Sequence, residues 1–157
     1  MRFLFDDDAG KEQLVLKGDP FKYIIKVRRH KVGDELGFRQ REVSRILYRY
    51  NIASIDGRSA TLELISSDEE PVAAAKPLHI GWCVVDSNSV EKVLPLLNGL
   101  GVTKITFIYC DRSQKNFKPD YKRYNRILES LMQQCGRSEM LLFDEVKNIE
   151  AFIARNP

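Results

Sequence analysis

Two arginines follow predicted elements, at places where a charged side chain can act on a ligand. The segment "CDRS" comes directly at the end of an apolar run of strand length, "GVTKITFIYC". Arg137 stands just beyond a run of helical periodicity that stops at Gly136. In open α/β sheets the loops at the carboxyl ends of the strands build the ligand site, so Asp111, Arg112 and Ser113 are well placed. An ordinary polar turn is the alternative interpretation of this segment.

Several common kinds of site are not indicated by the sequence. It contains no GxGxxG, no GxxxxGK[ST] and no serine in a GxSxG context. The three cysteines form no CxxC pair and there are only two histidines, so we expect no metal site. Cys135 ends a helical run, where the partial negative charge of the helix disfavours a thiolate nucleophile. We expect Cys83 and Cys110 to be reduced thiols inside apolar strands.

The second half of the chain alternates strand and helix patterns. Between the strand-like runs "LHIGWCVV" and "GVTKITFIYC", apolar residues recur at helical spacing. This succession predicts a βαβ unit with parallel strands and a right-handed crossover. We expect Asn88 and Glu91 to form a capping box in the first helix and Pro95 to kink it. A second helix, a strand in "EMLLF" and the start of another helix follow. The expected apolar face of the second helix is Tyr121, Tyr124, Ile127, Leu128, Leu131 and Cys135.

The first half of the chain predicts a small, mostly antiparallel β-barrel. Short strand candidates are bounded by Gly and Asp, and Asp56-Gly57 divides two strand-like runs. An Asp-Gly pair at that place favours a type I′ hairpin. Only "DPFKYIIKVRR" predicts a short helix, with Asp19 as its N-cap and Pro20 at the first helical position.

The predicted organisation is two units joined by an acidic, proline-containing segment. Residues 66–77 show no periodicity, which is typical of an exposed linker. We expect a β-barrel over residues 1–68, a linker over 69–77, and an α/β unit over 78–157. No apolar run is long enough to cross a bilayer, and the start of the chain runs into three aspartates rather than a signal-peptide core. A cytoplasmic protein without a membrane partner is therefore expected.

The net charge of +3 conceals two basic stretches. Residues 22–49 contain nine Lys and Arg against three acids, and residues 104–137 contain eight against three. The first set is Lys22, Lys26, Arg28, Arg29, Lys31, Arg39, Arg41, Arg45 and Arg49. The second set is Lys104, Arg112, Lys115, Lys118, Lys122, Arg123, Arg126 and Arg137. Aromatic residues are interspersed, which is typical of RNA-binding surfaces, although a solvated charged face is the alternative. His30 lies in the first stretch and is expected to contact RNA or solvent.

Three segments resemble one enzyme family along nearly the whole chain. "KVRRHKVGDELGF", "VEKVLPLLNGLGVTKITFIYCDRS" and "SLMQQCGR" are similar, in order and spacing, to the RsmE-type methyltransferases of the SPOUT class. The resemblance implies a PUA-like N-terminal β-barrel, then an α/β SPOUT-like domain with a C-terminal knot, in a homodimer. It also implies transfer of a methyl group from S-adenosylmethionine to N3 of a uridine in 16S ribosomal RNA of the small ribosomal subunit.

The resemblance assigns roles to individual residues. Lys26, Arg28 and Arg29 match the family's basic element that faces RNA. Arg112 matches the arginine after the second strand. Gln134 and Arg137 match the helix end near the active site. We expect Arg112 and Arg137 to be catalytic, because a guanidinium beside the uridine carbonyl oxygens stabilises the charge that develops when the N3 proton leaves. The other four, Gln134 included, are expected to bind RNA.

The family's cofactor motifs, a "G-P-E-G-G" loop and an "L-G-x-R-I-L-R-x-E-T-A" segment, do not occur in this sequence. We expect the cofactor contacts downstream of Pro157, so that this chain alone would lack methylation activity. The positions of the family's lysine and glutamate in the first α/β helix are held here by Leu96 and Gly99. A non-catalytic RNA-binding protein is the alternative function.

Overall fold

The computed structural model describes residues 1–114 and 116–156, and the chain folds into two compact units. The first is Met1–Pro71 and the second is Val72–Pro157. None of the helices among the described residues is long and apolar enough to cross a membrane. The boundary lies within the predicted linker, but the preceding strand continues further than the sequence suggested.

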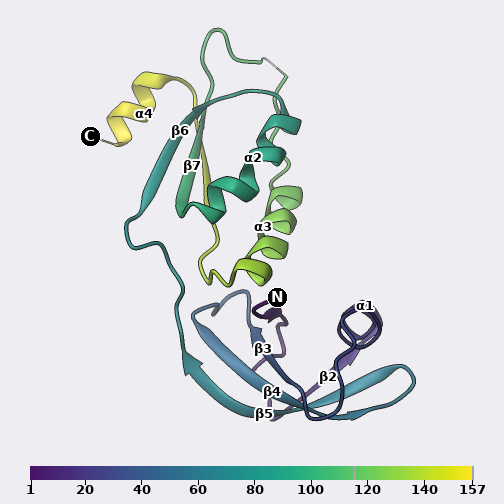
Figure 1. Cartoon of the computed structure of the whole chain (residues 1–157). Coiled ribbons are helices and arrows are strands. Elements are labelled where there is room, and N and C mark those ends of the chain that lie inside the picture. Colours follow the sequence, from purple (N-terminus) through teal and green to yellow (C-terminus); the bar gives the residue numbers. More distant parts are fainter. Residues whose placement is uncertain (115, 157) are drawn as a thin grey trace. The chain divides into compact units, whose positions relative to one another are not determined.

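The first unit is built on one five-stranded sheet with the order β1-β3-β4-β5-β2. Its strands are β1 (Leu4–Phe5), β2 (Gln13–Lys17), β3 (Glu35–Arg39), β4 (Ile46–Ile55) and β5 (Ser59–Glu69). All neighbours are antiparallel except β1 and β3, which are parallel. The sheet curls (Figure 1), and two register shifts between β4 and β5 mark the irregularities that bend such strands. The prediction of a mostly antiparallel β unit is confirmed.

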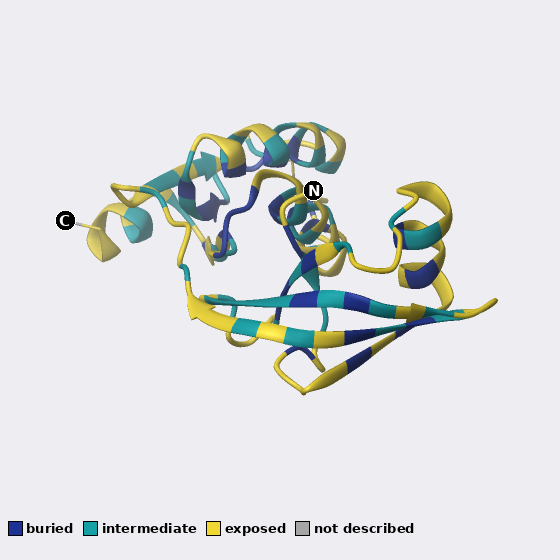
Figure 2. Cartoon of the chain, turned by 60° about the horizontal axis from the view of Figure 1, so that its bottom comes forward, coloured by how far each residue is buried: buried dark blue, intermediate teal, exposed yellow. Residues whose placement is uncertain are grey.

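Alternation of side chains gives this sheet a single buried face. In β2, Leu14 and Leu16 are buried while their neighbours are exposed, and buried and exposed segments alternate along the strands in Figure 2. The rings of Phe38 and Tyr50 form a T-shaped pair with their centroids 5.5 Å apart. The Tyr50 hydroxyl accepts a hydrogen bond from the Gly10 amide and donates one to the Lys11 carbonyl. These bonds hold the N-terminal segment against the sheet.

The β4–β5 hairpin forms where the sequence predicted it, but its turn is different. Gly57 does not have the positive φ that a type I′ turn requires at that position. Instead the Asp56 carboxylate accepts hydrogen bonds from the amides of Arg58 and Ser59 and from the Ser59 hydroxyl. The aspartate side chain therefore shapes the turn that the glycine was expected to shape.

The predicted short helix is present, with a different start and an unusual second half. α1 (Gly18–Phe21) begins after Lys17, so Asp19 and Pro20 lie two positions further into the helix than expected and Asp19 is not the N-cap. The chain then continues as a π-helix, η1 (Lys22–Val27), in which the Arg28 amide bonds to the Tyr23 carbonyl. The wider turn allows the side chains of Phe21 and Ile24 to be buried against the sheet. The local sequence does not reveal this packing requirement.

The expected linker is partly strand. β5 extends through Glu69, with Asp68 and Glu69 opposite Leu47 and Ile46 of β4. The acids of this segment pair with arginines of the same sheet, Arg49 with Asp68 and Glu70, and Arg45 with Glu69. These pairs compensate the acidic charges that made the segment look unstructured, while Asp68 and Glu69 remain exposed as predicted.

The second unit has a parallel three-stranded sheet in the order β6-β7-β8. The elements are β6 (Leu78–Cys83), α2 (Ser87–Gly99), β7 (Val102–Ile108), α3 (Tyr121–Cys135), β8 (Leu142–Val146) and α4 (Ile149–Arg155). Both strand pairs are parallel, so the predicted βαβ arrangement is confirmed. The third strand lies three residues later than "EMLLF", because its register against β7 starts with Leu142 opposite Lys104.

Helix ends in this unit are set by local side chains. Asp86, and not Asn88, is the N-cap of α2, and its carboxylate accepts from the Ser89 amide at 2.9 Å. α2 continues past Pro95 to Gly99. α3 begins at the N-cap Asp120 and ends at Gly136, whose φ of 91° confirms the predicted left-handed residue. Its buried residues are Tyr124, Leu128 and Met132, while Cys135 of the predicted face is exposed.

Candidate functional site

The carboxyl edge of the parallel sheet carries the loop of residues 109–120, where the sequence placed a ligand site. After β7 the Ser113 amide bonds to the Cys110 carbonyl, and the Ser113 hydroxyl accepts from the Cys110 amide at 2.8 Å. This turn leaves Asp111 and Arg112 exposed. The structure thus places Arg112 beyond the end of the central strand, with its charge available to a ligand.

A cluster that the sequence did not reveal holds both ends of this loop. Glu145 of β8 accepts a hydrogen bond from the Tyr109 hydroxyl at 2.6 Å and another from the Tyr121 hydroxyl. Tyr109 opens the loop and Tyr121 is the first residue of α3. Burial and the hydrogen bond to Glu145 raise the pKa of Tyr109 to about 12, and the same causes raise the pKa of Tyr121. Both phenols therefore remain protonated donors, and one carboxylate fixes where the loop begins and ends.

Arg137 lies at the opposite edge of the sheet. Its side chain is only 8% exposed, and Nη1 donates to the Asn98 carbonyl at 2.6 Å, which joins the ends of α3 and α2. Its Nε and Nη2 atoms are buried without a partner among the described residues. Arg137 also lines a 330 Å³ cavity with Thr103 and Leu142, near the amino ends of β7 and β8, together with Glu139 and Met140.

The two arginines expected to be catalytic are consequently not brought together. β7 has seven residues and separates the edge of Arg137 from the edge of Arg112, a span of about 20 Å at roughly 3.3 Å per residue. Figure 1 shows the loop after β7 at one end of the sheet and the end of α3 at the other. The sequence could not reveal that the two arginines lie at opposite edges, because Arg112 follows a strand and Arg137 follows a helix, and the order of elements does not show where each one ends in space. Within one chain they do not contact the same base.

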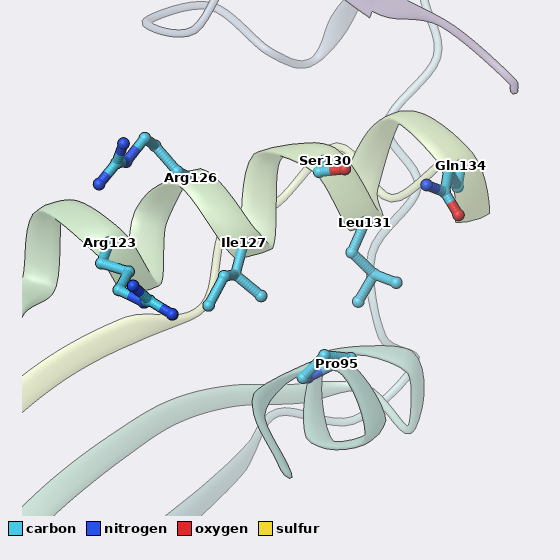
Figure 3. Close-up of a pocket in the computed structure, with 7 residues that line it drawn as sticks. All are labelled: Pro95, Arg123, Arg126, Ile127, Ser130, Leu131 and Gln134. Carbon is cyan, nitrogen blue, oxygen red and sulfur yellow. The ribbon is translucent and has the colours of Figure 1, made fainter. Parts of the chain in front are cut away.

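Gln134 lies on a groove between α2 and α3. The groove has a volume of about 510 Å³ and is lined by Pro95, Arg123, Arg126, Ile127, Ser130, Leu131 and Gln134. Figure 3 shows Ile127 and Leu131 of α3 pointing toward Pro95 of α2, whereas Arg126 extends away. Arg123 pairs with Glu91 of α2 at 2.8 Å. The floor of the groove is apolar and its rim is polar. Because Arg123 and Arg126 line the same groove, Gln134 is near the basic residues of α3 and not near Arg112.

In the first unit the exposed basic residues gather on η1 and the segment after it. Lys26, Arg28 and Arg29 are all exposed. The Lys26 ammonium lies 5.8 Å from the Phe21 ring centroid, and the Arg28 guanidinium lies 5.6 Å from that of the exposed Tyr23. Arg29 has a φ of 62°, a left-handed conformation that is unfavourable for arginine. The structure brings these three predicted RNA-binding residues together; we name them, with Tyr23, the η1 surface.

The other arginines of the first basic stretch form hydrogen bonds and ion pairs within the first unit. Arg39 is buried and donates to the carbonyls of Ser44 and Glu70. Arg41 pairs with Asp7, and Arg45 and Arg49 pair with the acids of β5 and Glu70. In the second stretch Lys104 pairs with Asp144, and Lys115 lies outside the described residues. The basic charge that remains for a partner is therefore more localised than the sequence indicated.

His30 closes a small loop beside the η1 surface. Its Nδ1 lies 3.0 Å from the Asp34 carboxylate, which also accepts from the Lys31 amide. The Lys31 amide and His30 lower the pKa of Asp34. His30 and Arg28 line a 240 Å³ hollow with residues of the N-terminus and β3. His30 thus orients the backbone that follows the η1 surface. Among the described residues, no group of His, Cys, Asp and Glu side chains could hold a metal ion.

Comparison with known proteins decides the family. Residues 73–157 match the RNA methyltransferase domain family. Two relatives named ribosomal RNA small subunit methyltransferase E, from two strains of Helicobacter pylori, are 32% and 31% identical over 160 residues, covering 100% of this chain. The chain belongs to the RNA methyltransferase family. The resemblance seen in the sequence is thereby confirmed.

Solved structures that are named as methyltransferases have the same fold as this chain. A probable rRNA methyltransferase from Porphyromonas gingivalis superposes with a TM-score of 0.78 at 20% identity over 100% of this chain. A ribosomal RNA small subunit methyltransferase E from Neisseria gonorrhoeae, bound to S-adenosyl methionine, gives a TM-score of 0.70 at 14% identity over 96% of this chain. The chain spans 70% of the length of the Helicobacter relatives and 65% and 64% of these two structures.

Proposed function

We propose that the protein is a ribosomal RNA small subunit methyltransferase that transfers a methyl group from S-adenosylmethionine to N3 of a uridine in 16S rRNA. The observation that carries this proposal is the alignment of the whole chain with relatives of that name at 32% identity. The α/β unit with a charged loop at its carboxyl edge supports it. A non-catalytic RNA-binding role is not favoured, because the matching family is a methyltransferase family. Action on ribosomal RNA agrees with a cytoplasmic location.

The first unit is proposed to be the PUA-like barrel that binds the RNA. Lys26, Arg28 and Arg29 supply charges for phosphates, and Tyr23 offers an aromatic face on which a base can stack. A π-helix suits this role, because such turns occur frequently at functional sites and here project the basic residues away from the buried Ile24. Gln134, with the basic residues of α3, is proposed as a second RNA contact.

Arg112 is proposed to act on the reacting base. Loss of the N3 proton leaves negative charge on the flanking carbonyl oxygens of the uridine, and an exposed guanidinium beside them lowers the barrier. The Tyr109–Glu145–Tyr121 cluster holds the loop that carries Arg112. Arg137 cannot share this base within one chain, so its proposed catalytic role requires a second copy in the expected homodimer. Otherwise it stabilises the helix ends.

The described residues do not by themselves fit the cofactor. The loops after β6, β7 and β8 contain no glycine, so none offers the bare backbone that close approach of a nucleoside favours. Both oxygens of Glu145 already accept from tyrosines. S-adenosylmethionine remains the proposed methyl donor because of the relatives.

The first test is methyl transfer to small ribosomal subunits that lack the modification. The complete gene product is incubated with S-adenosylmethionine, and N3-methyluridine is measured by mass spectrometry of the digested 16S rRNA. Arg112→Ala should lower turnover roughly a hundred-fold, the magnitude typical of removing one group that stabilises developing charge. Arg58→Ala, in the β4–β5 turn, should leave it unchanged. No N3-methyluridine with the unaltered protein would refute the proposed reaction.

The second test is calorimetric titration with S-adenosylmethionine. We expect heat of binding with the longer Helicobacter pylori relative and none with the 157-residue chain. Binding to this chain would show that its own loops form a cofactor site and would overturn our interpretation of the carboxyl edge.

A further inference from the structure

Two cysteine sulfur atoms meet at the carboxyl edge of the sheet. The Sγ atoms of Cys83 and Cys110 are 3.4 Å apart. Cys83 lies in a strand as predicted, because it is the last residue of β6, but it is exposed. Cys110 lies two residues beyond β7, so its predicted place inside the strand is wrong. The residues are 27 positions apart in sequence, and the strands that lead to them, β6 and β7, are parallel neighbours. Their approach is a product of the fold.

The backbone holds both thiols in position. Cys83 is opposite Ile108 in the ladder, and the Val84 amide continues the pairing by bonding to the Ile108 carbonyl at 3.0 Å. The Cys110 amide bonds to the Ser113 hydroxyl, which fixes the turn from which Cys110 projects. A disulfide requires the sulfur atoms to come to about 2.0 Å, so side-chain rotation has to close only about 1.4 Å.

The two thiols differ in chemical character. The hydrogen bond with Cys83, followed by burial, raises the pKa of Cys110. Cys83 is the more exposed of the two residues, so a reagent in solution reaches its sulfur first. Cys135, at the end of α3, is exposed as well, but its thiol faces the Met132 carbonyl and no second sulfur among the described residues. It provides an internal comparison.

We propose that Cys83 and Cys110 are a redox modification site that forms a reversible intramolecular disulfide by exchange with a small-molecule disulfide. The Cys83 thiolate attacks one sulfur of the reagent and releases the first small thiol, leaving a mixed disulfide on Cys83. Cys110 then attacks the Cys83 sulfur and releases the second. The protein loses two hydrogens, which appear on the two released thiols, and the reagent is the oxidant. The product joins the end of β6 to the loop that carries Arg112.

Such a bond suits a reducing compartment only as a transient state, which is the usual behaviour of redox-sensitive pairs there. Its reversal needs a small thiol in excess and no other cofactor. The proposal stands on the geometry of the two strands and does not depend on the methyltransferase reaction.

The test equilibrates the protein with defined mixtures of oxidised and reduced glutathione, blocks the remaining thiols by alkylation, and maps tryptic peptides by mass spectrometry. Lys and Arg positions place the three cysteines on separate peptides. We expect the cross-linked Cys83–Cys110 pair to exceed any pair with Cys135 by at least ten-fold. Excess reduced glutathione should remove it.

Two variants complete the test. Cys135→Ser should form the same cross-link, whereas Cys83→Ser should leave Cys110 reduced or carrying glutathione. The proposal is overturned if Cys83 and Cys110 each carry glutathione to the same extent as Cys135. It is equally overturned if the cross-link joins two chains, which the intact mass under non-reducing conditions would show.

Discussion

Glu145 shows how much one side chain can organise at the candidate site. Its carboxylate accepts from two phenols that lie at the two ends of the 109–120 loop. A hydrogen bond from a neutral phenol to a carboxylate is stronger than one between neutral groups, because the acceptor is ionised. The loop that carries Arg112 is therefore anchored to β8 as well as to its own strand.

At this scale we predict the effect of Glu145→Gln. Loss of the charged acceptor should lower the pKa of Tyr109 from about 12, although burial keeps it above the ordinary value for tyrosine. The measurement is a spectrophotometric titration of the phenols. Glu139→Gln, at the opposite edge of the sheet, should leave the titration unchanged. An unaltered Tyr109 titration in Glu145→Gln would show that the carboxylate does not hold the phenol.

At the scale of the element, helix ends depend on a few residues with special conformations. Gly136 ends α3 with a φ of 91°, and its amide bonds to the Met132 carbonyl at 2.7 Å. Gly99, the last residue of α2, has an ordinary φ, and a Cβ added there would meet nothing within 4 Å. The backbone conformation thus favours glycine at position 136 but not at position 99.

We predict opposite effects of alanine at these two positions. Gly136→Ala should destabilise the protein by about 1 kcal/mol, because an L side chain is strained in the left-handed region. Gly99→Ala should be neutral or stabilise by up to about 1 kcal/mol, since alanine has the better helix propensity. Urea unfolding measures both. Equal effects would mean that the conformation of Gly136 is not what makes glycine necessary there.

The N-cap of α2 gives a pH-dependent prediction. The Ser89 hydroxyl and amide lower the pKa of the Asp86 carboxyl. A depressed pKa in the folded state means that the stabilisation is complete above the pKa of the unfolded state and is lost as pH falls through the folded value. Stability should therefore decrease in acid below about pH 4, the usual aspartate range. Asp86→Asn keeps the cap but removes its titration, so comparing urea midpoints at about pH 3 and about pH 7 should show a smaller decrease in this variant. An equal decrease would assign the acid sensitivity to other carboxylates.

For the whole molecule, the distribution of charge decides which surface attracts RNA. Four arginines of the first unit already form hydrogen bonds or ion pairs within it: Arg39, Arg41, Arg45 and Arg49. The exposed basic cluster of this unit is therefore Lys26, Arg28 and Arg29. Binding to phosphates releases counterions, so the affinity for RNA should fall steeply as salt increases. The net charge of +3 would not by itself predict this.

We predict that Lys26→Ala and Arg28→Ala each weaken binding to an rRNA fragment and lower the slope of log affinity against log salt by about 1. Arg45→Ala should have no comparable effect, because Glu69 already neutralises that charge. Filter binding at several salt concentrations measures the slopes. If Arg45→Ala changed the slope as much as Arg28→Ala, the RNA would contact the sheet as well as the η1 surface, and the assignment of binding to the η1 surface alone would be wrong.

Local sequence patterns determined a large part of this protein. Apolar spacing located the βαβ unit, Gly136 marked the end of α3, and the Asp56-Gly57 pair marked a hairpin. Motif order identified the family that the comparison with relatives confirmed. These features depend on residues within a few positions of one another, or on the order of motifs along the chain, and both are visible in one dimension.

Only the tertiary structure decided which of these residues meet. Glu145 joins Tyr109 across 36 positions, Cys83 meets Cys110 across 27, and the acids of β5 and Glu70 compensate arginines that looked available to RNA. The π-helix and the separation of Arg112 from Arg137 likewise follow from packing on a sheet. Strand register brings distant residues together or places them at opposite edges, and no local pattern specifies that register.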